Sequence, residues 1–140
     1  MLILTLIGLL IAAFAIYTFI LWFNKYTYHH AQYEFFTREH SVSMVFSYAL
    51  MFFGNSWMQT ALKNNDDWLN GAIVLAVGVA LLLGVIVNNF KQAPRLYAIA
   101  GSLAQMVFYI PITIGAVIIV AVMVAWFSET KPVYNINGRD

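Results

Sequence analysis

Four long stretches of the chain contain no Asp, Glu, Lys, Arg or His, and they constrain the fold more than any other feature. They are Leu2–Phe23, Ser41–Leu62, Trp68–Phe90 and Leu96–Phe127. Each is long enough to cross a bilayer as a helix, which takes about 20 mostly apolar residues. Of the 140 residues, 62% are hydrophobic and 9% charged, too apolar a mixture for a soluble domain of this size. The sequence predicts an all-α, polytopic membrane protein, a single four-helix transmembrane bundle over residues 1–140.

The fourth stretch is too long for a straight crossing. Its 32 residues would extend about 48 Å as one helix, against about 30 Å of hydrocarbon. Pro111 lies near the middle, and a proline removes one backbone hydrogen bond and crowds the preceding turn. We therefore expect a fourth helix that is kinked or broken at Pro111. In the broken form, only the part after Pro111 would make the crossing.

The connections between the stretches differ in length and character. Residues 63–67 form a tight polar turn, so the second and third helices should be antiparallel neighbours, and residues 91–95 are equally short. The polar connection 24–40 is longer and combines charge with many Tyr and Phe residues. It either extends the first helix or lies along the membrane surface. Residues 128–140 form a polar tail.

The basic residues predict the orientation in the membrane. Connections 24–40 and 91–95 lie on one side and hold Lys25, Arg38, Lys91 and Arg95, whereas the other side holds three basic residues. Lys and Arg are in excess in cytoplasmic loops. We expect these two connections in the cytoplasm and both termini outside it.

The third stretch contains a row of small residues. Ala72, Ala76, Ala80 and Gly84 recur every four positions, which places them on one stripe of a helix where another helix can approach closely. The row therefore predicts a helix-packing interface, either within the subunit or between subunits. The alternative is that an Ala-, Gly- and Val-rich membrane helix produces such a row by chance.

Neutral polar residues lie within the second and fourth stretches. Asn55 and Gln59 belong to the second, and Gln105, Tyr109 and Thr113 recur every four residues in the fourth. A polar side chain in hydrocarbon needs a partner. These residues therefore form interhelical hydrogen bonds, which is their ordinary use, or line a hydrated pore or cofactor cleft.

The three histidines do not form a metal site by their spacing. His29 and His30 are adjacent and point about 100° apart on a helix. His30 and Glu34 could hold two positions of a site, but no further ligand follows, and the chain has no cysteine. We predict neither a metal nor a cofactor.

Several functions are disfavoured by what the sequence lacks. Proton-coupled transport requires an ionisable group in the membrane, and the four stretches hold no acidic or basic residue. No nucleophile–base motif is present, so we expect no enzymatic activity from this chain alone. A net charge of +1 gives no basic surface for nucleic acid.

Two functions remain. The first is a non-catalytic membrane subunit with a structural role in a larger membrane protein complex. The second is a homo-oligomeric channel or pore lined by the second and fourth helices. The expected partners are membrane lipids and other membrane subunits or copies of this chain.

Overall fold

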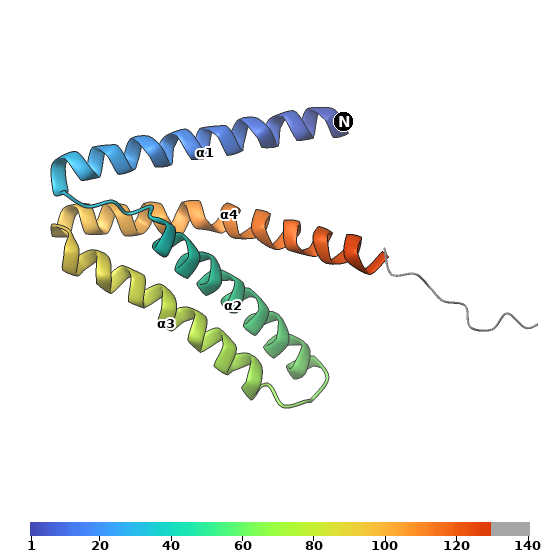
Figure 1. The fold of residues 1–140 in the computed structure, drawn as a ribbon. Coiled ribbons are helices and arrows are strands. Elements are labelled where there is room, and N and C mark those ends of the chain that lie inside the picture. Colours follow the sequence, from blue (N-terminus) through green and yellow to red (C-terminus); the bar gives the residue numbers. More distant parts are fainter. Residues whose placement is uncertain (130–140) are drawn as a thin grey trace, which may run out of the picture.

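The computed structural model describes residues 1–129, with side chains through Ser128, as four helices joined by short connections. The helices are α1 (Leu2–Ala31), α2 (Arg38–Lys63), α3 (Leu69–Gln92) and α4 (Arg95–Glu129). They meet at one end of the molecule and spread toward the other, with α2 and α3 staying together as a hairpin (Figure 1). The predicted all-α fold is confirmed.

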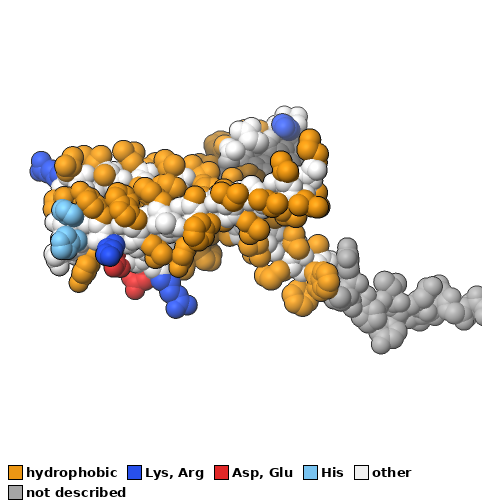
Figure 2. Space-filling view, turned by 90° about the horizontal axis from the view of Figure 1, so that it is seen from above, with side chains coloured by type: hydrophobic (Ala, Val, Ile, Leu, Met, Phe, Trp, Pro, Cys, Tyr) orange, Lys and Arg blue, Asp and Glu red, His pale blue; other side chains and the backbone are white. Residues whose placement is uncertain are grey.

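Three of the described helices, α1, α3 and α4, are long and apolar enough to cross a membrane. Hydrophobic side chains cover most of the face of the molecule seen in Figure 2. The helix α2 has 26 residues, also enough to cross, but its serines and amides make it the most polar of the four. A fourth crossing by α2 stays a prediction.

The boundaries of α1 and α2 differ from those predicted. Helix α1 continues eight residues beyond Phe23 and ends at Ala31, where Gln32 adopts a left-handed backbone with φ 54°. Helix α2 begins at Arg38, since the Thr37 hydroxyl accepts a hydrogen bond from the backbone N–H of His40. The connection is thus only 32–37, and the alternative in which residues after Phe23 extend the first helix is the one observed.

Helix α4 is continuous through Pro111, so the predicted break is wrong. A proline in a helix removes only one hydrogen bond, and the turns on either side keep theirs. The kinked form stays a prediction. Of the predicted polar tail, Ser128 and Glu129 continue α4, and residues 130–140 lie outside the described part of the chain.

The hairpin of α2 and α3 is held by a seam with alternating spacings of three and four residues, as in a coiled coil. Three glycines, Gly54, Gly71 and Gly78, bring the backbones into contact. A Cβ on Gly54 would lie 2.8 Å from the Gly71 carbonyl oxygen, and a Cβ on Gly78 would lie 2.8 Å from the Ser47 carbonyl oxygen. The Ser47 hydroxyl donates to the Gly78 carbonyl at 2.6 Å. On α2 the seam comprises Met44, Ser47, Met51, Gly54, Met58 and Ala61, and on α3 Gly71, Leu75, Gly78, Leu82, Val85 and Asn89.

Candidate functional site

The connection 32–37 enters the bundle at the end where all four helices meet. Phe35 and Phe36 are buried, and the ring of Phe35 packs directly on Gly101 of α4, where a Cβ would overlap it. Asn24 of α1 holds the same connection, since its amide donates to the Phe36 carbonyl at 2.8 Å and accepts from the Phe36 N–H at 2.9 Å. The connection is therefore a structural part of the core.

A buried hydrogen-bond network lies beside Phe35, with Asn89 of α3 at its centre. The Asn89 side chain accepts from the Tyr33 hydroxyl at 3.0 Å, and donates to the Ser102 hydroxyl at 3.1 Å and to Gln105 Oε1 at 2.6 Å. Gln105 in turn donates to the Phe35 carbonyl oxygen. Three separate segments, namely the connection, α3 and α4, are thus joined by polar side chains, of which Asn89, Ser102 and Gln105 are almost fully excluded from solvent.

His40 extends this network toward the surface. Its Nδ1 lies 2.9 Å from the Phe35 carbonyl oxygen, which can only accept, so Nδ1 carries the proton. The Asn88 amide nitrogen lies 3.2 Å from Nε2, and it can donate to this atom where Nδ1 alone carries the proton. The Asn88 amide also donates to the Tyr33 hydroxyl at 3.3 Å. His40 of α2 thus links the connection to α3.

The chemistry of the network suits positioning better than catalysis. Most of its members are amides and hydroxyls, which do not titrate near neutral pH, and burial raises the pKa of the Tyr33 phenol above its usual 10.0 although the Asn88 bond opposes this. Within the described residues, no three His, Cys, Asp or Glu side chains lie together in a way that could hold a metal ion. The network can therefore hold the helices in place at the end where they meet, and we call it the hub.

The polar residues predicted from the fourth helix lie on its buried face. Gln105 belongs to the network, and the Tyr109 hydroxyl bonds the Ser41 hydroxyl of α2. Thr113 is also buried, and its hydroxyl has no partner in the described part of the chain. By contrast, Asn55 and Gln59 are exposed on α2, so the two predicted polar sets do not line one cavity within a single subunit.

The predicted small-residue row lies beside the seam that joins α3 to α2, and most of it is exposed. Ala76, Ala80 and Gly84 are exposed and Ala72 is half-buried, and a Cβ on Gly84 would meet nothing within 4 Å. The hairpin seam on the neighbouring face of α3 supplies the contact with α2 instead. The predicted helix-packing interface, within the subunit or between subunits, stays a prediction.

Sequence reasoning missed the members of the network that lie outside the predicted polar sets. They are Tyr33, His40, Asn88, Asn89 and Ser102. The one signal for them in the sequence was the pair of adjacent amides at 88 and 89. Neighbouring helical side chains point about 100° apart, so the two amides can bond partners on different sides of the helix. Asn89 bonds a residue 56 positions away, a pairing that no local pattern contains.

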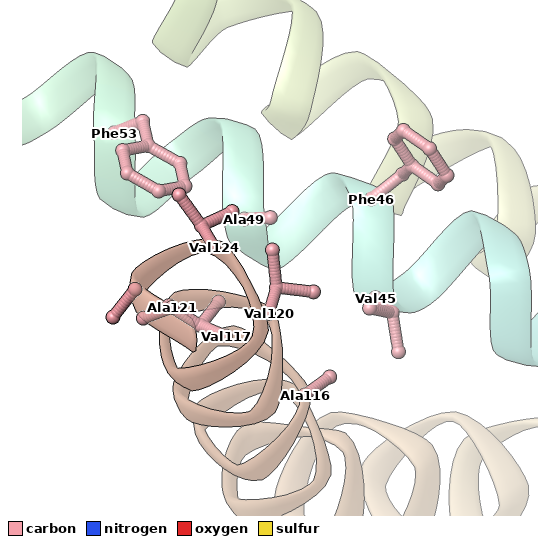
Figure 3. Close-up of a pocket in the computed structure, with 10 residues that line it drawn as sticks. Val45, Phe46, Ala49, Phe53, Ala116, Val117, Val120, Ala121 and Val124 are labelled. Atoms are coloured by element: carbon pink, nitrogen blue, oxygen red, sulfur yellow. The ribbon is translucent and has the colours of Figure 1, made fainter. Parts of the chain in front are cut away.

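An apolar cleft opens between α2 and α4 beyond the last polar contact. It has a volume of about 650 Å³, and side chains of the two helices face each other across it (Figure 3). Four of its lining residues are alanines, namely Ala49, Ala116, Ala121 and Ala125. A second apolar cavity of about 480 Å³ adjoins it at Val117. The two helices are therefore in contact near the hub and separated further along.

Polar and apolar surfaces are segregated along the molecule. Histidines and several charged side chains gather at the end where the helices meet, on the left of Figure 2, and apolar side chains cover most of the remaining visible length. Comparison of the chain with protein-family models, with curated proteins and with solved structures finds no match in any of the three.

Proposed function

We propose that this chain is a non-catalytic membrane subunit that packs within a larger membrane protein complex. In this proposal all four helices cross the bilayer, with α2 shielded by its neighbours. The connections 32–37 and 93–94 face the cytoplasm, and both termini lie on the opposite side. The single observation that carries the proposal is the cleft between α2 and α4, which is apolar and has four alanines among its ten lining residues.

The exposed parts of α1 and α4 support this proposal. Helix α4 is buried only as far as Thr113; beyond it, Val124 is 63% exposed and Trp126 is 69% exposed. Residues 1–15 of α1 are also exposed throughout. Helix association in membranes relies on close backbone approach at small residues, and the alanines of the cleft allow a helix of another subunit to approach closely.

The polar hub also supports a structural role for this chain. Its hydrogen bonds are made within the chain, and they fix the angles at which the helices leave the common end. A subunit of this kind offers a preformed cleft, and binding to a preformed site avoids the ordering cost of assembling one. We therefore propose a helix from a different subunit as the occupant of the cleft.

The test combines native electrophoresis with a pair of matched variants. The complex is extracted in a mild detergent, and every co-migrating chain is identified by mass spectrometry. We expect a fixed-stoichiometry mixture from the native chain. Ala121→Phe fills the cleft and should reduce the recovered partner at least fivefold, whereas Ala100→Phe, on an exposed part of α4 outside the cleft, should leave recovery unchanged.

Two results would refute the proposal. Equal partner recovery with both variants would remove the cleft as the docking site. A pure homo-oligomer would instead favour the alternative, a pore lined by α2 and α4, in which the exposed Asn55 and Gln59 would face the lumen of the assembly. In that case Asn55→Leu with Gln59→Leu should abolish ion flux in reconstituted vesicles.

A further inference from the structure

A polar groove separate from the apolar cleft lies between α2 and α3, near the hub. It has a volume of about 340 Å³. Glu39, His40 and Ser43 line it from α2 and Asn88 from α3, while the small residues Ala80 and Gly84 form part of its α3 side. Its walls thus join one acidic side chain to several neutral polar groups.

Two free polar groups of this groove, Asn88 Oδ1 and the Glu39 carboxylate, can only accept a hydrogen bond, and the Ser43 hydroxyl can accept as well as donate. The Asn88 amide nitrogen uses its two N–H groups on Tyr33 and His40, which leaves Oδ1 as an acceptor with no partner among residues 1–128. The Glu39 carboxylate and the Ser43 hydroxyl likewise make no side-chain bond in this part of the chain. His40 Nε2 is already occupied by Asn88. The group that complements this set carries a positive charge and several N–H donors.

The position of the groove indicates where such a group comes from. Glu39 is the second residue of α2, and Asn88 lies four residues before the end of α3, which is long and apolar enough to cross a membrane. The groove is therefore at the level of the lipid headgroups if α3 spans the bilayer. Below it, the exposed row through Ala80 and Ala76 provides a shallow apolar surface along which an acyl chain can lie.

We propose that the groove binds a phospholipid whose headgroup carries a primary ammonium. The ammonium forms an ion pair with Glu39 and donates to Asn88 Oδ1 and the Ser43 hydroxyl, and an acyl chain follows the small-residue row of α3. Lys91, three residues beyond Asn88 and therefore on the same side of the helix, provides a counter-charge for the phosphate. This inference rests on the bilayer crossing of α3 that is part of the proposed function, but it does not depend on any partner subunit.

The experiment compares lipids that differ only in the headgroup. The purified chain in detergent is titrated with phosphatidylethanolamine, phosphatidylcholine and phosphatidylglycerol of identical acyl chains, and bound lipid is counted by native mass spectrometry. Phosphatidylcholine keeps the positive charge but has no N–H donor, and phosphatidylglycerol has no positive charge. We expect phosphatidylethanolamine to bind at least tenfold more tightly than either.

Matched variants identify the carboxylate as the source of this preference. Glu39→Gln should lower the affinity for phosphatidylethanolamine about tenfold and remove the preference. Glu34→Gln, an exposed acid in the connection that does not line the groove, should retain it. Ser43→Ala removes a single acceptor and should lower the affinity about threefold. Helical circular dichroism shows whether each variant is folded.

Three results would overturn the inference. One is equal binding of the three lipids by the native chain, and another is an unchanged preference in folded Glu39→Gln. The third is full competition by soluble glycerophosphoethanolamine, which would mean that the groove recognises a free ammonium compound and that the acyl chain contributes nothing. None of these results involves the α2–α4 cleft, so the proposed function would be unaffected by them.

Discussion

Replacing Asn89 by leucine tests whether the polar hub holds the helices together. The side chain of Asn89 makes three hydrogen bonds, to Tyr33, Ser102 and Gln105. Interhelical hydrogen bonds in membrane proteins contribute about 0.6 kcal/mol each on average and about 1.7 kcal/mol at most. Losing three of them should therefore lower the free energy of unfolding by about 2–5 kcal/mol, because leucine has a similar size and fills the same space.

The measurement is an unfolding titration in mixed micelles, in which the fraction of sodium dodecyl sulfate is raised and helical circular dichroism is followed. Asn55→Leu is the matched control, because Asn55 is exposed and the same chemical change there removes no hydrogen bond of the described chain. We expect a change below about 0.5 kcal/mol for this control. If Asn89→Leu were no more destabilising than Asn55→Leu, the hub would not be a source of stability, and our account of the helix ends would be refuted.

Three further predictions follow from the packing and from the titration of the connection. Gly101→Ala should destabilise the chain by about 1–3 kcal/mol, because the new methyl group overlaps a buried aromatic ring; Gly115→Ala, where nothing lies within 4 Å, should be neutral or slightly stabilising in the same titration. Gly54→Leu should separate the α2–α3 hairpin, with reduced protection in hydrogen exchange, whereas Gly84→Leu on the open face should leave that protection intact. The Tyr33 phenol should ionise above pH 10.0, because burial raises its folded-state pKa. Its stabilising contribution is therefore complete below that pH and is lost as the pH rises through the folded-state pKa. The difference in phenolate absorbance between the native chain and Tyr33→Phe would measure this ionisation.

The helices could be predicted from the sequence because their signal is local. Long stretches without charge predicted most ends of α1, α3 and α4 to within a few residues. The short polar turn predicted the α2–α3 hairpin. The end of α1 was left open between two alternatives, because helical propensity continues through charged residues after Phe23. A membrane span is marked by hydrophobicity, but the helix itself ends where Gln32 turns left-handed.

The packing faces were harder to predict because two periodicities were present on α3. The row at Ala72, Ala76, Ala80 and Gly84 has a strict spacing of four, whereas the seam that contacts α2 alternates between three and four. A partner seam with the same alternation runs along α2 through Met44, Met51 and Met58. A comparison of the two helices for the same alternating spacing would have identified the α2–α3 contact. The pattern on α3 alone could not identify it.

The network could not be predicted, since its geometry depends on how the connection 32–37 folds back. A chain segment with Phe35 and Phe36 side by side gives no indication that both enter the core, and the space for Phe35 exists only because position 101 is a glycine. Once Phe35 is buried, its carbonyl oxygen must find donors. Gln105 and His40 supply them, so the burial of one aromatic ring explains the polar residues around it.

The arrangement of contacts gives the two ends of the molecule different mechanical roles. Helix α1 is held through residues in its second half, by Asn24 on the connection and by the stacking of Phe19 on Phe108 at 4.6 Å. Residues 2–15 of α1 are exposed, so the contacts in the second half of the helix set the direction in which they extend. A small rotation at the hub becomes a large displacement at the far end, since a helix extends about 1.5 Å per residue. Fixing the hub with buried hydrogen bonds therefore fixes the width of the cleft, and a partner helix that fills the cleft would in turn stabilise the hub.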